Sequence, residues 1–86
     1  MTDYRVGRGV RWSVGRVTLT LADAKGNVRT LRYPEAAVFD LVSRGRPFAK
    51  VVSLTAHILS LDAAGAEALV RSTLEEWADG GFLERV

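Results

Sequence analysis

The chain has 86 residues, no cysteine, one histidine and a formal net charge of +2. This length predicts a single small domain, and a composition with 48% hydrophobic and 26% charged residues is ordinary for a folded protein. Without cysteine there are no disulfides and no thiolate metal sites, and one histidine excludes a multi-histidine metal centre. Since no apolar segment is long enough to span a membrane and no signal-peptide pattern opens the chain, we expect a cytoplasmic protein without a metal or cofactor.

The small net charge conceals two oppositely charged halves. Residues 1–50 carry ten basic and four acidic residues, a net charge of +6. Residues 51–86 carry two basic and six acidic residues, a net charge of −4. Many of the basic residues are arginine, which a GC-rich coding sequence explains as well as function does. The polarity between the halves still constrains where an acidic partner could bind.

The first nine residues alternate arginine with small or apolar residues from Arg5 onward. Such a segment is typical of a flexible arm whose arginines keep it soluble and block edge pairing. The alternative is an arm that holds phosphates, because the planar guanidinium matches phosphate oxygens. We expect residues 1–9 to form a flexible basic arm and residues 10–86 to form the domain.

Residues 10–33 have the period-two hydrophobic pattern of strands. The pattern shifts by one residue at Gly15, which indicates a bulge or a break between two strands. Turn-forming residues at 23–27 then predict a hairpin in which residues 17–22 pair with residues 27–32. On the second of these strands, one face carries Arg29, Leu31 and Tyr33.

Three helices are expected in the rest of the chain. Pro34 and Pro47 each suit a first helical turn, Gly45 lies just past the first helix, and the second runs to about Ser60. Asp62 is a good N-cap for the third helix, which Gly80 and Gly81 end. The expected apolar stripe of this helix contains Leu69, Val70, Thr73, Leu74 and Trp77. A short extended tail follows and could add an edge strand.

Strands, three helices and a short terminal strand in one small domain predict an α+β, winged-helix-like fold. Catalysis is the function least supported by the residues. His57 is the only imidazole, and no nucleophile elbow or triad framework is present. The acidic residues Glu75, Glu76 and Asp79 are typical of a solvated helix face. We therefore expect a protein that is not an enzyme and has no catalytic residues.

The third helix of a winged-helix domain usually enters the major groove of DNA. Here residues 62–79 contain five acidic residues and only Arg71 as a base, a net charge of −4, which phosphates would repel. DNA binding through strand arginines such as Arg29 and Arg32 stays the alternative. A sheet edge that accepts an extended peptide fits the charge pattern better. A third interpretation is a homodimer formed through Trp12 and the tail.

Two segments also resemble a known family. They are residues 33–42 (YPEAAVFDLV), with the following Gly45-Arg46-Pro47-Phe48 break, and the pattern Leu74-x-x-Trp77-x-x-Gly80-Gly81-Phe82-Leu83. With the preceding strands, they resemble the PqqD-like family over roughly residues 17–86. Members of that family are precursor-peptide recognition elements of ribosomally made, post-translationally modified peptide pathways. The amino-terminal hairpin followed by helices also resembles the DNA-binding output domains of response regulators.

The PqqD-like resemblance implies a non-catalytic chaperone that holds a leader peptide as an added strand between residues 28–32 and the third helix. Carried over, the expected peptide contacts are Arg29, Leu31, Tyr33, Leu69, Arg71 and Thr73. The implied partners are a precursor peptide and a modifying enzyme such as a radical-SAM enzyme. The arginine-glycine arm matches nothing in that family and leaves room for another role.

Overall fold

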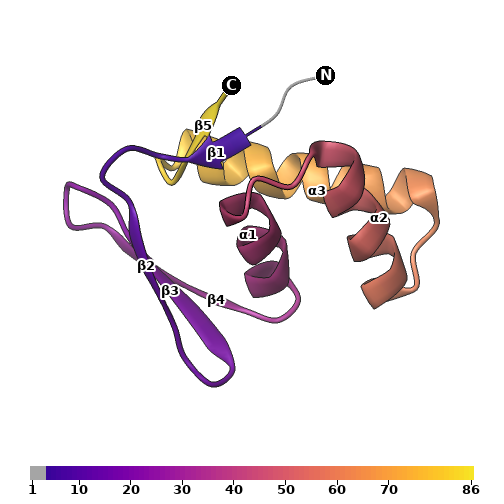
Figure 1. Cartoon of the computed structure of the whole chain (residues 1–86), viewed down its shortest axis with the longest axis horizontal. Coiled ribbons are helices and arrows are strands. Elements are labelled where there is room, and N and C mark those ends of the chain that lie inside the picture. Colours follow the sequence, from indigo (N-terminus) through magenta and orange to yellow (C-terminus); the bar gives the residue numbers. More distant parts are fainter. Residues whose placement is uncertain (1–3) are drawn as a thin grey trace.

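The structure is a computed structural model and describes residues 4–86. Eight elements follow one another along the chain (Figure 1). The strands are β1 (Tyr4–Val6), β2 (Arg11–Val14), β3 (Thr18–Ala22), β4 (Val28–Arg32) and β5 (Leu83–Arg85). The helices are α1 (Glu35–Ser43), α2 (Phe48–Leu59) and α3 (Ala63–Asp79). The expected α+β architecture of an amino-terminal antiparallel sheet, three helices and a terminal strand is confirmed.

β2, β3 and β4 form an antiparallel sheet in that order. The phase shift at Gly15 is a break between two strands, because the Gly15 N–H donates to the Thr18 carbonyl at 2.8 Å across a tight turn. The β3–β4 hairpin has the expected pairing, from Thr18 opposite Arg32 to Ala22 opposite Val28. Its loop is held by the Asp23 carboxylate, which accepts the N–H groups of Lys25 and Asn27 at 2.9 Å each.

The helices begin and end where the local sequence predicts. Asp62 caps α3 by accepting the Gly65 N–H at 2.6 Å, which satisfies one of the donors that a helix start leaves free. Gly45, with φ of +74°, reverses the chain after α1. The buried stripe of α3 is Ala66, Val70, Leu74 and Trp77. Leu69, expected within this stripe, is instead 41% exposed at its edge.

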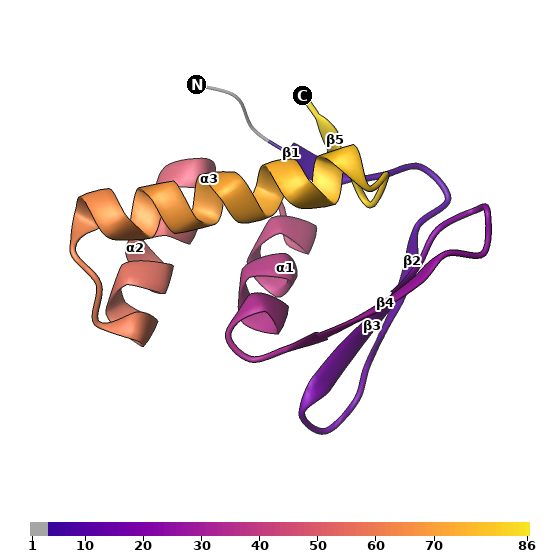
Figure 2. The same ribbon diagram turned by 180° about the vertical axis from the view of Figure 1, so that it is seen from behind.

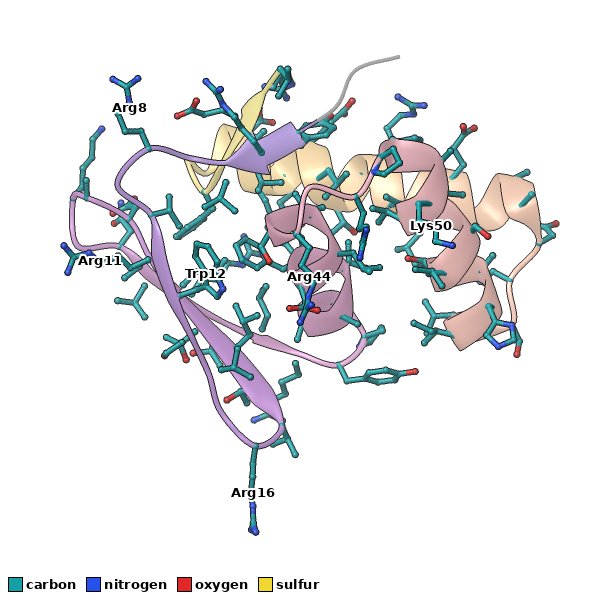
Figure 3. All side chains as sticks on the ribbon, in the orientation of Figure 1. Arg8, Arg11, Trp12, Arg16, Arg44 and Lys50 are labelled. Carbon is teal, nitrogen blue, oxygen red and sulfur yellow. The ribbon has the colours of Figure 1, made fainter. Side chains whose placement is uncertain are left out.

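A row of three aromatic rings joins the sheet to the helices. The Phe39 ring of α1 meets Trp12 of β2 at 5.8 Å and Trp77 of α3 at 5.7 Å, both edge to face. Phe39 is fully buried and Trp77 is 1% exposed. Trp12 lies between β2 and α1, whereas Arg16 extends into solvent from the β2–β3 turn (Figure 3). The Phe39 ring of α1 therefore lies between Trp12 of the sheet and Trp77 of α3. Figure 2 shows α3 running across the upper ends of α1 and α2.

The two ends of the described chain pair with each other. β1 and β5 form a separate antiparallel pair, with Val6 opposite Leu83. The Glu84 carboxylate accepts the Arg8 backbone N–H at 2.8 Å and forms an ion pair with Arg5 at 3.1 Å. Residues 4–6, expected within a flexible arm, are thus a strand whose Tyr4 and Val6 pack against the core. Met1, Thr2 and Asp3 of that expected arm lie outside the described residues.

Within residues 4–86, no helix has the length and hydropathy needed to cross a bilayer.

Removing the central ring should cost much of the fold's stability. Phe39→Ala deletes both edge-to-face contacts and leaves a cavity, so we expect the free energy of unfolding to fall by about 3–5 kcal/mol. Urea unfolding followed by tryptophan fluorescence measures this change. Val17→Ala, at a side chain 77% exposed, is the matched control and should change the free energy by less than about 0.5 kcal/mol. Equal effects of the two substitutions would contradict the role given to Phe39.

Acid should weaken the β1–β5 pair through Glu84. The Arg8 N–H and then the Arg5 guanidinium hold the pKa of Glu84 below its ordinary value of 4.5. A lowered pKa in the folded state contributes stability above the ordinary pKa, and that contribution is lost as pH falls through the lowered value. Glu84→Gln should therefore reduce the loss of stability below about pH 4.5. Urea unfolding at a series of pH values tests this, and an unchanged pH dependence would refute it.

Candidate functional site

The outer edge of β4 carries backbone groups that pair with no other strand among residues 4–86. In an antiparallel pair, hydrogen-bonded and non-hydrogen-bonded residues alternate. The Asp23 N–H donates to the Asn27 carbonyl at 3.0 Å, so alternation along the register turns the peptide groups at positions 29 and 31 toward β3. The N–H and C=O groups of Val28, Thr30 and Arg32 consequently point to the open edge.

Successive side chains of β4 point to opposite faces of the sheet. Leu31 is 2% exposed and belongs to the hydrophobic core under the sheet. Arg29 points to the same face but lies beyond the core, where it reaches α3. Tyr33 follows the end of β4 and is 64% exposed. It lines a hollow of about 250 Å³ between the β2–β3 turn and the start of α1.

One flank of α3 faces β4. The Glu76 carboxylate on this flank accepts a hydrogen bond from the Arg29 guanidinium, and the two form an ion pair. Thr73 and Leu69 lie on the same flank, about one and two helical turns before Glu76. The half-exposed Leu69 therefore adds an apolar side chain to the flank that carries Glu76. The free edge of β4 and this flank of α3 together are called the β4–α3 groove below.

Arg71 lies on the other flank of α3. Its guanidinium is 4.8 Å from the centre of the Phe48 ring on α2, and it forms an ion pair with Glu67 at 3.7 Å. Phe48 and Glu67 also line a hollow of about 350 Å³ between α2 and α3. Arg71 is therefore turned toward α2 and away from the β4–α3 groove.

The structure thus separates the six residues expected at the site. Arg29, Leu69 and Thr73 border the groove, Leu31 lies beneath it in the core, and the other two, Tyr33 and Arg71, lie at different surfaces. Sequence reasoning placed the added strand at residues 28–32 but did not identify which peptide groups face the open edge. It assigned Glu76 to a solvated helix face and did not pair it with Arg29. The period-two pattern contains part of the first signal, because alternate residues of an edge strand direct their peptide groups away from the neighbouring strand. The register of the β3–β4 pair decides which residues these are.

A hollow of about 270 Å³ lies where the β3–β4 loop meets the end of α3. The loop contributes Asp23, Lys25 and Asn27, and the helix end contributes Asp79 and Gly80. Hydrogen bonds from Asn27, its side-chain amide above all, lower the pKa of Asp23 below its usual value of 3.8. The hollow therefore has a charged, polar lining beside the first residue of β4.

The groove offers hydrogen bonds, an apolar wall and one pair of opposite charges. These groups suit binding of an extended chain, since the open backbone of β4 can accept one more strand. Within residues 4–86, no three histidine, cysteine, aspartate or glutamate side chains are grouped so that they could hold a metal ion. His57 is exposed on α2, outside the groove.

Comparison with known proteins gives one informative result. No protein-family model matches the chain, and no curated protein matches it. A solved structure of TbiB1 in complex with the TbiA(beta) leader peptide has the same fold, with a TM-score of 0.88. The two chains share 18% identity, and the match covers 93% of this chain and 94% of the matched one. The shared fold therefore extends over nearly the whole of both chains.

Proposed function

We propose that this chain is a non-catalytic, cytoplasmic chaperone of the PqqD-like kind that binds the leader of a precursor peptide and presents it to a modifying enzyme. The observation that carries the proposal is the open edge of β4 beside α3. TbiB1, which has the same fold, is itself in complex with a leader peptide. That likeness supports a peptide ligand, and the groove supplies a place for it.

Binding would proceed by addition of a strand. The N–H and C=O groups of Val28, Thr30 and Arg32 would pair with the peptide backbone and give affinity that is largely independent of sequence. Selectivity would come from every second side chain of the peptide, which points inward toward Leu69 and Thr73 on α3. The groove has no group positioned for acid–base or nucleophilic chemistry, so the modifying enzyme would supply the reaction.

Thr30→Pro should weaken strand addition while leaving the sheet intact. Proline removes the N–H that points to the open edge, and an edge strand tolerates proline at such a position. We expect the affinity for a leader peptide to fall by about tenfold or more, the equivalent of one or two backbone hydrogen bonds. Fluorescently labelled leader segments from short reading frames beside this gene are the probes, titrated by anisotropy.

Val14→Pro is the matched control. Val14 lies on β2 at the opposite edge of the same sheet, and alternation turns its N–H away from β3. The control should bind the peptide as the wild type does, with both variants folded by circular dichroism. No binding by the wild type would refute the proposal. So would strong, salt-sensitive binding of duplex DNA that is lost in an Arg29→Ala/Arg32→Ala variant.

Two substitutions on α3 test which flank of the helix meets the peptide. Leu69→Ala removes the apolar side chain on the Glu76 flank and should weaken peptide binding several-fold, because the peptide loses apolar contact area. Arg71→Ala, on the flank that packs against Phe48, should leave the affinity unchanged. Isothermal titration of the same leader segments measures both. A larger loss with Arg71→Ala would place the peptide on the α2 side of α3.

A further inference from the structure

An ion pair crosses the β4–α3 groove. The Arg29 guanidinium on β4 donates to the Glu76 carboxylate on α3, across 47 positions of sequence. The other ion pairs among residues 4–86 lie within the β1–β5 region, at the end of α1, within α3, or between the end of α3 and β5. Arg29 and Glu76 therefore form the single ionic link between the three-stranded sheet and a helix in the described chain.

A strand added at β4 would enter the space that this ion pair spans. The side chain of Arg29 points to the inner face of the sheet, as does that of Leu31. Arg29 occupies a non-hydrogen-bonded position relative to the open edge, where side chains of paired strands are closest. The peptide residue opposite Arg29 would also point inward, so its side chain would lie within about 5 Å of Arg29 at Cβ.

The two members of the ion pair differ in what they lose when a peptide separates them. The side chain of Glu76 is 61% exposed and that of Arg29 is 38% exposed. Glu76 can therefore return its carboxylate to water at little cost, and an ion pair this exposed contributes little to stability. Arg29 becomes more covered once a strand lies beside it. Because a guanidinium keeps its charge at any physiological pH, it then needs a new anionic partner.

We propose, on the basis of the function proposed above, that the groove selects peptides with an aspartate or glutamate opposite Arg29. The peptide carboxylate takes the place of Glu76 on the Arg29 guanidinium, and Glu76 turns to solvent. Arg29 is then a specificity-determining residue that fixes the register of the bound strand. Glu76 is the intramolecular stand-in for the peptide's acidic side chain when the groove is empty.

A display library of random peptides tests this inference with no need to identify the natural ligand first. Each peptide is long enough to pair along the whole open edge of β4. The wild type should enrich peptides with a common acidic position within their apolar pattern. The exchanged variant Arg29→Glu/Glu76→Arg, which retains an ion pair of opposite polarity, should enrich a basic residue at that position. The same acidic preference in both selections would overturn the inference and leave the proposed function standing. No enriched peptide with the wild type would overturn both.

Single substitutions in the peptide and in the protein, made separately and together, measure the contact between Arg29 and the peptide carboxylate. In the best selected peptide, replacing the acidic residue by its amide should weaken binding to the wild type by about tenfold, as expected for a charged hydrogen bond that the complex covers. With Arg29→Gln the two peptides should bind equally. Arg44→Gln, which removes the exposed ion pair with Asp40 at the end of α1, should keep the tenfold difference. Equal sensitivity of the Arg29→Gln variant and the wild type would refute a contact between Arg29 and the peptide.

Discussion

The position of Phe39 between Trp12 and Trp77 determines how the sheet and the helices are arranged. The ring is fully buried and meets one indole from β2 and another from α3. Since the Phe39 ring lies between Trp12 and Trp77, α3 is not packed directly on β4. The edge of β4 is left open, and what connects it to α3 is the pair of long side chains, Arg29 and Glu76. A groove with a hydrogen-bonding wall thus follows from the placement of one aromatic ring.

The pairing of β1 with β5 keeps that edge open. An unpaired edge strand invites another strand, and the carboxyl-terminal segment of the chain is extended and follows α3 closely. Leu83 is nevertheless buried against the core beside Val6, and Glu84 is held by Arg5 and the Arg8 N–H. The two terminal strands therefore pair with each other, and neither competes for the backbone of residues 28–32.

Local signals in the sequence predicted most of the fold, and contacts between distant residues account for the rest. Asp62 and Gly45 mark ends of helices by their own side-chain or backbone chemistry, so their roles were evident without a structure. Gly15 left a bulge and a strand break both open until the structure showed the break. The β1–β5 pair joins residues 79 positions apart, and nothing local distinguishes such a strand from a flexible arm. Period-two spacing likewise placed Leu31 and Arg29 on one face of β4, but which face would be buried depends on where α1 packs.

The basic half and the acidic half of the chain both border the β4–α3 groove. Glu67, Glu75 and Asp79 leave the exposed part of α3 acidic, which opposes the phosphate contacts that a DNA-reading helix requires. On the groove side, the same helix presents Glu76, and the basic sheet presents Arg29 to it. The opposite charges of the two halves thus meet beside the open edge of β4, where a ligand strand can be added. A ligand that brings its own carboxylate exchanges one ion pair for another and leaves no covered charge without a partner.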